Sequence, residues 1–265
     1  MLSYQHLYHA GNLADVHKHA ALAWVLDYLV QKPKPLTYIE THAGRGLYDL
    51  DAPEARRTAE AAAGIARAEA LFPPDHPYRQ RLMEVRAAHG PRAYPGSPLI
   101  AALGLREGDR LHLAELHPQE VVHLRRHAAA WGAHVHQRDG FELALALTPP
   151  TPRRGLMLID PSYEVKADYE AIPRHLAQIH RKWNVGILIL WYPLLTAGAE
   201  APMLAALARA FPDHLRHDLR FAPARDGHRM LGSGLFVVNP PFGLGDELQQ
   251  ITTRLAVLSK PAAGA

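Results

Sequence analysis

The sequence predicts an α/β fold in which helices pack on a mostly parallel sheet. Short apolar runs end at polar or glycine-containing turns, as residues 156–159 do at Asp160, and such runs indicate strands buried on both faces. Segments with helical spacing of apolar residues alternate with these runs. The 265 residues are 48% hydrophobic, which is enough to bury a large core in a single domain over residues 1–265.

The first elements fit the start of a nucleotide-type α/β fold. A polar and aromatic segment, residues 1–13, precedes a helix over residues 14–30. A strand over residues 36–40 then runs into a turn that contains Gly44 and Gly46. Glycines let a ligand approach the backbone closely, and a strand followed by such a turn is typical of nucleotide-binding units.

Residues 51–93 break the alternation of strands and helices. They are rich in Ala, Arg and Glu and contain Pro73, Pro74 and Pro77. We expect two or three short helices here, forming a small insertion within the single domain. The insertion could grip RNA or could be a purely structural lid, and the sequence leaves both alternatives open.

The alternation resumes after the insertion. Ser97 followed by Pro98 predicts a helix start with Ser97 as the N-cap, and Ser97 could contact a cofactor at the same time. With the strand at 36–40, the sheet is expected to have seven strands, the last two forming a hairpin at its edge. The other strands are expected at residues 110–115, 133–137, 156–159, 185–191, 215–221 and 235–239, and the other helices at residues 97–105, 141–147, 171–182 and 200–210 and after Pro118.

Acidic residues stand at the carboxyl ends of three expected strands. These ends meet at one edge of a parallel sheet, where open α/β sheets bind ligands. Glu115 could accept both hydroxyls of a ribose there. Asp139 could accept from the amino group of an adenine, with Gly140 leaving room for the ring. An ordinary Asp-Gly turn is the alternative for that pair.

The third acid begins the motif Asp160-Pro161-Ser162-Tyr163. The exocyclic amine of adenine is a poor nucleophile, because its lone pair is delocalised into the ring. The Asp160 carboxylate and the Pro161 carbonyl could both accept its N–H bonds, and the Tyr163 ring could stack on a flipped base. An ordinary strand end followed by an Asp-Pro turn is the alternative.

Composition excludes several classes of function. There is no Cys, so disulfides, thiolate metal sites and a cysteine nucleophile are excluded. We expect no metal, because His123 and His127 lack further ligands and fit a solvated helix face. The net charge of +3 does not by itself indicate a nucleic-acid partner, although paired arginines could neutralise phosphates. Without a long apolar run or a signal peptide, a cytoplasmic protein with no membrane association is expected.

Motifs spread in order over almost the whole chain resemble the bacterial RlmJ family, the 23S ribosomal RNA adenine-N6 methyltransferases. The motifs are Met1-Leu2-Ser3-Tyr4, His9-Ala10-Gly11-Asn12 with Asp15, Lys18-His19, Thr41-His42-Ala43-Gly44 with Gly46 and Tyr48, Tyr94-Pro95-Gly96-Ser97-Pro98-Leu99-Ile100-Ala101, Glu115-Leu116-His117-Pro118, Asp139-Gly140, Arg153-Arg154-Gly155, Asp160-Pro161, Trp191-Tyr192-Pro193 and Asn239-Pro240-Pro241.

The resemblance implies a Rossmann-like class I methyltransferase that uses S-adenosyl-L-methionine and releases S-adenosyl-L-homocysteine. The implied reaction methylates N6 of an adenine in 23S rRNA, at position 2030, on naked RNA or an early ribosomal precursor. The implied enzyme is a monomer with no obligate protein partner. The resemblance implies that Asp160, Pro161 and Tyr163 act in catalysis and that Tyr4 and Lys18 contact the RNA. The cofactor-binding residues that it implies are His19, His42, Ser97, Glu115, Asp139, Gly140 and Asp160.

Two departures and three alternatives accompany this resemblance. Ser162 replaces the second proline of the usual Asp-Pro-Pro-Tyr motif, which keeps the carbonyl acceptor, and Arg45 stands in the glycine-rich turn where a small residue is usual. The same fold could methylate a DNA adenine or a protein glutamine, which also presents an sp² nitrogen. It could also bind RNA without turnover.

Overall fold

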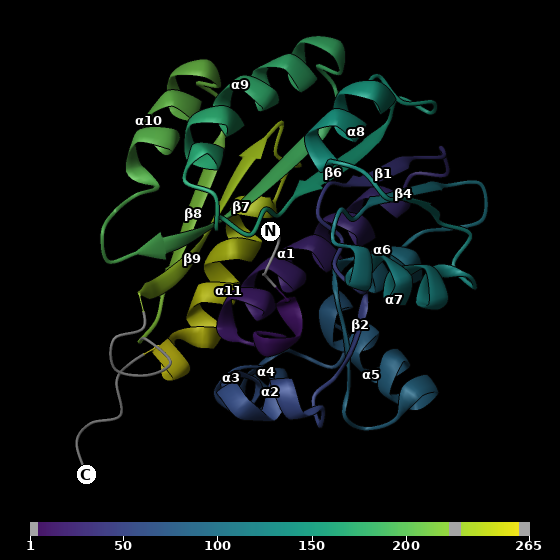
Figure 1. Cartoon of the computed structure of the whole chain (residues 1–265), viewed down its shortest axis with the longest axis vertical. Coiled ribbons are helices and arrows are strands. Elements are labelled where there is room, and N and C mark those ends of the chain that lie inside the picture. Colours follow the sequence, from purple (N-terminus) through teal and green to yellow (C-terminus); the bar gives the residue numbers. More distant parts are fainter. Residues whose placement is uncertain (1–4, 223–228, 260–265) are drawn as a thin grey trace.

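Seven strands form one sheet in the order β5-β4-β1-β6-β7-β9-β8 (Figure 1). The computed structural model describes residues 5–222 and 229–259. Among these residues β9 is the strand that runs against the others, since it pairs antiparallel with β7 and β8. The strands are β1 (Thr37–Glu40), β4 (Arg110–Ala114), β5 (His134–His136), β6 (Gly155–Ile159), β7 (Ile187–Leu195), β8 (Leu215–Arg220) and β9 (Met230–Val238).

Helices cover both faces of this sheet (Figure 1). One layer packs on the face that carries Leu158 and Val237, and the other on the face that carries Met157 and Phe236. The central strands are apolar on both faces because both are covered. The first layer contains α1 (Leu13–Val30), α6 (Ser97–Gly104), α7 (Pro118–Ala128) and α11 (Leu244–Ser259), and the second contains α8 (Gly140–Leu147), α9 (Ala167–Lys182) and α10 (Ala201–Ala210).

The predicted seven-stranded, mostly parallel sheet and its hairpin edge are therefore confirmed. The topology is that of Rossmann-like methyltransferases, with the antiparallel strand inserted next to the edge. No helix within the described ranges is long and apolar enough to cross a membrane.

Helix α1 is enclosed on most sides, because it packs against α5, α6, α11 and β9. Its polar residues His17, Lys18 and His19 are as buried as its apolar ones, each less than 5% exposed. Buried polar groups need partners inside the protein. The partners of Lys18 and His19 help to build the site described below.

The segment between β1 and β4 contains more structure than the sequence predicts. An antiparallel ribbon of β2 (Leu47–Asp49) and β3 (Ala93–Pro95) brackets the helices. Three-residue strands give too short a pattern to be predicted. The helices between them are α2 (Pro53–Thr58), α3 (Glu60–Ala63), α4 (Ile65–Ala68) and α5 (Pro77–His89), with a 3₁₀ turn at Glu69–Leu71.

Two strand boundaries differ from their predictions. Strand β7 continues through Pro193 to Leu195, because its pairing with β6 ends at Leu190 and only β9 accompanies it further. A proline is tolerated where a strand has a partner on one side only. Strand β9 begins at Met230, whereas the prediction began at residue 235 because the glycines in this part weakened the strand pattern. Gly234 has a packing reason, since the Tyr192 ring leaves no room for a Cβ there.

Two helix predictions were wrong or incomplete. Ser97 is the first residue of α6, and Gly96 occupies the N-cap position without a side-chain bond. The Ser97 hydroxyl instead bonds a strand residue, as shown below. No helix was predicted after the strand at residues 235–239, whereas α11 occupies Leu244–Ser259.

Candidate active site

A cavity of ≈ 510 Å³ lies where the carboxyl ends of β1, β4 and β6 approach α1. This size is within the range of small-molecule sites. All the predicted site residues that the structure describes line it, and Tyr4 lies outside the described residues. They are Lys18, His19, His42, Ser97, Glu115, Asp139, Gly140, Asp160, Pro161 and Tyr163.

Glu115 joins the end of β4 to the glycine-containing turn after β1. Its Oε2 accepts the backbone N–H of Gly44 at 2.7 Å, and its Oε1 accepts that of His117 at 2.7 Å. Burial raises the pKa of Glu115, although both N–H bonds act in the opposite direction. Each carboxylate oxygen has more than one lone pair, so Glu115 can still accept from the hydroxyls of a ligand in the cavity.

Asp139 and Gly140 begin α8 beside this turn. Asp139 caps the helix, since its Oδ1 accepts the backbone N–H of Glu142 at 2.9 Å. A Cβ at position 140 would stand 2.0 Å from the carbonyl oxygen of Thr41. The close approach of two backbones therefore requires the glycine, a reason that the sequence did not reveal.

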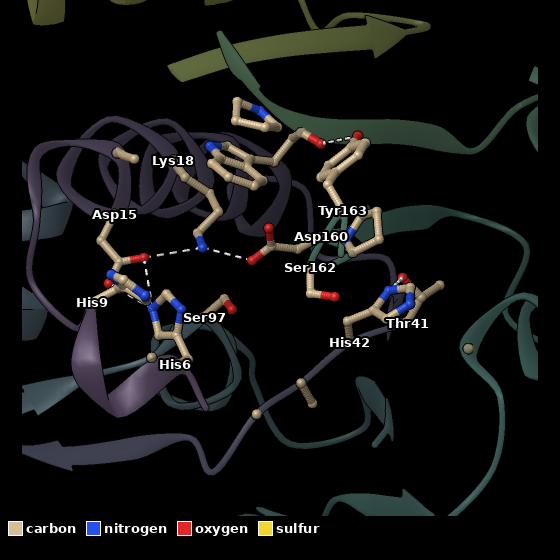
Figure 2. Close-up of a pocket in the computed structure, with 18 of the residues that line it drawn as sticks. His6, His9, Asp15, Lys18, Thr41, His42, Ser97, Asp160, Ser162 and Tyr163 are labelled. Atoms are coloured by element: carbon tan, nitrogen blue, oxygen red, sulfur yellow. Dashed lines mark hydrogen bonds and ion pairs between the residues drawn. The ribbon is translucent and has the colours of Figure 1, made fainter. Parts of the chain in front are cut away.

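The Lys18 ammonium lies between two carboxylates (Figure 2). Its Nζ is 2.6 Å from Oδ2 of Asp160 and 3.1 Å from Oδ1 of Asp15. Burial alone would lower the pKa of Lys18, but the charges of Asp160 and Asp15 outweigh it and raise that pKa above its usual value. The amine is therefore charged, and the pair fixes the Asp160 carboxylate at the cavity wall.

Asp15 connects this pair to the segment that precedes α1. It accepts the backbone N–H of Gly11 at 2.9 Å and lies 2.9 Å from Nε2 of His6. Burial opposes ionisation of Asp15, but its interactions with His6 and Lys18 outweigh it, so the pKa of Asp15 lies well below its usual range. This carboxylate thus holds His6 against the cavity (Figure 2).

Neutral polar residues form the floor beneath Lys18. His19 Nδ1 is 2.9 Å from the hydroxyl of Tyr94. Burial is the main reason why the pKa of His19 falls to about 3. His42 lies across the cavity with its Nδ1 2.8 Å from Thr41 Oγ1, and burial lowers its pKa to about 4. Both imidazoles are therefore neutral at neutral pH.

Ser97 reaches a fully buried acid, Glu40, at the end of β1. Its Oγ is 2.5 Å from Oε1 of Glu40, and the Tyr38 hydroxyl is 2.8 Å from Oε2. Burial raises the pKa of Glu40 to about 8, so its carboxyl is mostly protonated at neutral pH. The bond to Glu40 explains why Ser97 does not cap α6.

The turn after β6 presents Asp160 and packs Tyr163 beside it. Tyr163 has a φ of 56°, a left-handed conformation that is uncommon for residues other than glycine. Its hydroxyl donates to the carbonyl of Trp191 at 2.7 Å, which anchors the ring to β7 (Figure 2). Its ring centroid lies 4.8 Å from that of Tyr169 and 6.0 Å from that of Trp191. Aromatic surfaces therefore surround the carboxylate.

The sequence analysis did not assign Asp15, Asn12 or Trp191 to the site, yet each lines the cavity. One signal could have revealed Asp15, because it belongs with His17, Lys18 and His19 to a polar group inside a helix that is otherwise apolar. The described residues contain no group of three or more His, Cys, Asp or Glu side chains arranged to hold a metal ion.

Comparisons with known proteins agree on one family. The family model of "Ribosomal RNA large subunit methyltransferase D, RlmJ" matches residues 33–265. Ribosomal RNA large subunit methyltransferase J of Escherichia coli is 40% identical, over 95% of this chain and 91% of that protein. The protein of the same name from Haemophilus influenzae is 36% identical, over 95% and 92%. The crystal structure of protein LPL1258 from Legionella pneumophila is 33% identical, with a TM-score of 0.86 over 96% of this chain and 95% of that chain.

Proposed function

The chain belongs to the RlmJ family of ribosomal RNA large subunit methyltransferases, and from this premise we propose that it methylates N6 of an adenine in 23S rRNA. The observation that carries the proposal is the Asp160-Pro161-Ser162-Tyr163 turn in the cavity, with a carboxylate fixed by Lys18 at 2.6 Å. Such a turn offers acceptors to an amino group and an aromatic surface to its ring.

The cavity fits S-adenosyl-L-methionine as the methyl donor. Glu115 stands beside the open turn at Gly44, where it would accept ribose hydroxyls. Asp139 would accept from the adenine amine, and His19, His42, Ser97 and Gly140 line the same space. When bound, the cofactor supplies an electrophilic methyl group on a positively charged sulfur.

The residues of this chain would position and polarise the target amine. Lys18 bonds Oδ2 of Asp160, which leaves Oδ1 to accept one amino N–H bond, while the Pro161 carbonyl accepts the other. These bonds would favour a tetrahedral nitrogen with an available lone pair. The nitrogen would take the methyl group that the cofactor supplies, with S-adenosyl-L-homocysteine as the product, and the amino proton, now acidic, would leave to Asp160 or to water. The Tyr163 ring packs against the base.

We also propose the state of the RNA substrate, the location and oligomeric state of the enzyme, and a role for the insertion. The substrate is 23S rRNA, naked or in an early ribosomal precursor, and the enzyme works on it in the cytoplasm as a monomer. In this proposal Tyr4 contributes to RNA binding, and the buried Lys18 acts on the RNA only through Asp160. The insertion over residues 51–93 belongs to the same domain, and its role is either to grip RNA or to form a lid.

Tritiated methyl transfer from S-adenosyl-L-methionine into undermethylated 23S rRNA tests the proposal. Wild type should place label in N6-methyladenine. Asp160→Asn keeps the shape of the side chain and should lose about a thousandfold or more in kcat/KM, and calorimetry measures how much of this loss comes from weaker cofactor binding. Asp213→Asn, an exposed acid before β8, is the control and should behave as wild type.

The outcome that contradicts the proposal is absence of label in RNA while the cofactor still binds. Label in DNA or in protein would then favour a DNA adenine or a protein glutamine as the acceptor. Absence of label in all three would favour RNA binding without turnover.

A further inference from the structure

A line of hydrogen-bonded side chains runs from the cavity wall to α11 on the outside of the helical layer. It starts at Trp191, which lines the cavity, and ends at Thr252. Trp191 Nε1–H donates to Ser233 Oγ at 2.9 Å, and Ser233 Oγ lies 2.9 Å from His17 Nδ1. His17 Nε2 lies 3.0 Å from His217 Nδ1, and His217 Nε2 lies 2.9 Å from Thr252 Oγ1.

The middle of this line is sealed from water. Ser233 and His17 are 0% exposed and His217 is 7% exposed. Burial lowers the pKa of both histidines, so each is a neutral imidazole with one donor and one acceptor nitrogen. If each group donates to the next one along the line, from Trp191 through Ser233 and the two histidines to Thr252, every hydrogen bond has one donor and one acceptor. The five side chains therefore form one continuous network.

Trp191 contacts both parts of the proposed methyl-transfer centre. Its carbonyl accepts the Tyr163 hydroxyl at 2.7 Å, and its ring lies under the Lys18 ammonium, 5.6 Å from Nζ to the centroid. A cation over an aromatic face is attracted to it, and Lys18 in turn holds Asp160. The Tyr163 ring also lies near the indole, with 6.0 Å between the centroids, so the orientation of the indole bears on Tyr163 directly and on Asp160 through Lys18.

We propose that Trp191 is a positioning residue of the methyl-transfer site and that Ser233, His17, His217 and Thr252 form a buried network that fixes its indole plane. This inference rests on the proposed function, because positioning matters only if Asp160 and Tyr163 receive a base. Among the described residues of β8, β9 and α11, Met230 at the start of β9 lines the cavity, and the rest of these elements does not. The network gives these late elements a role in the site.

Two variants break the network at different distances from the cavity. Ser233→Ala removes the acceptor of the indole N–H, and Ser233→Thr restores a hydroxyl. Thr252→Val has nearly the same shape as threonine and removes the far end on a partly exposed helix position, where folding is least at risk. Thr37→Ala is the control, because it also removes a buried hydroxyl, whose bond of 2.9 Å to the Pro152 carbonyl lies at the amino end of β1, outside the cavity lining.

The indole N–H resonances report the network directly. The chain has four tryptophans, so four signals are expected in an ¹⁵N correlation spectrum, and Trp191→Phe assigns the one that it removes. Ser233→Ala should shift that signal upfield and speed its exchange with water. Thr252→Val should shift it less, and Thr37→Ala should leave it in place.

Kinetics separate positioning from a loss of fold. Ser233→Ala should lower kcat for RNA methylation about tenfold, as a small misplacement of reacting groups does, and should leave KM for the cofactor unchanged. Ser233→Thr should recover most of kcat. Thr37→Ala should keep kcat even where its melting temperature falls as far as that of Ser233→Ala.

Three outcomes would overturn the inference. An unshifted Trp191 signal in Ser233→Ala shows that the network is absent in solution. A shifted signal with full kcat shows that the indole does not position the site. A kcat loss that follows melting temperature equally in Ser233→Ala and Thr37→Ala shows a general effect of stability. If the wild-type protein shows the Trp191 signal but methylates no RNA, the result counts against the proposed function alone. The indole N–H shifts of the variants would still show whether the hydrogen-bonded network exists.

Discussion

The two halves of the cavity are built by different means. On the side of β4 and β5, Glu115 and Asp139 are partly exposed and their carboxylates accept backbone N–H groups from their own neighbourhood. On the side of α1 and β6, Lys18, Asp15 and Asp160 are largely buried and pair with one another. The first half relies on local backbone geometry and the second on long-range charge pairs.

This difference separates binding from chemistry. A partly exposed carboxylate keeps access to a ligand and contributes modestly to stability when it is removed. A buried ion pair left with one partner is strongly destabilising, because the remaining charge has no compensation. We therefore expect substitutions in the first half to change cofactor affinity, and substitutions in the second half to change both turnover and stability.

The largest effect is expected for Lys18→Met. It leaves Asp15 and Asp160 buried without their shared cation, so the free energy of unfolding should fall by about 3 kcal/mol and methyl transfer should be lost. Urea denaturation and the RNA assay measure the two. Arg138→Met, which removes the exposed pair with Glu142, is the control and should change stability by less than about 0.5 kcal/mol. Equal losses of stability in both variants would show that the buried pair contributes no more than the exposed one.

A smaller effect is expected for Glu115→Gln. The amide can accept through one oxygen only, so one of the bonds to Gly44 and His117 weakens and a ribose hydroxyl loses its charged acceptor. Calorimetry should show cofactor affinity about tenfold weaker, with kcat retained at saturating cofactor. Glu142→Gln, on the exposed first turn of α8, should bind as wild type. A fall in kcat at unchanged affinity would contradict the division between the two halves.

The last effect is a pH dependence and concerns Glu40, which lies between the halves. Burial raises its pKa from 4.5 to about 8, so between these values the folded state holds a proton that the unfolded state has released. The free energy of unfolding should therefore fall as pH rises through this window. Glu40→Gln is neutral throughout, so its stability should depend less steeply on pH. Urea denaturation at pH 5 and pH 8 measures both slopes, and identical slopes would refute the raised pKa.

The half that depends on local structure was predictable from the sequence. Glu115 follows β4 directly and Asp139 stands three residues after the end of β5, and the carboxyl ends of parallel strands meet at one edge. The sheet itself followed from the same apolar runs. The short ribbon strands β2 and β3 and the glycine-interrupted start of β9 gave patterns too short or too irregular to reveal them. Helix α11 has a regular helical pattern over 16 residues and was overlooked.

The half that depends on long-range pairs was not predictable in its geometry. Lys18 and Asp160 are separated by 142 positions, and His17 and Ser233 by 216. Spacing along a sequence carries no signal for such contacts. Resemblance supplied Lys18 and Asp160 as separate site residues, but only the structure shows that they form one ion pair with Asp15.

The burial of α1 has a consequence for the order in which the protein is made. This helix leaves the ribosome early, yet partners of its polar residues lie on β6, β8 and β9, which are synthesised much later. Contacts between distant parts of a chain form slowly, because a long loop must close first. Docking of α1 therefore follows synthesis of β9, and a nascent chain that lacks its last strands has no assembled methyl-transfer centre.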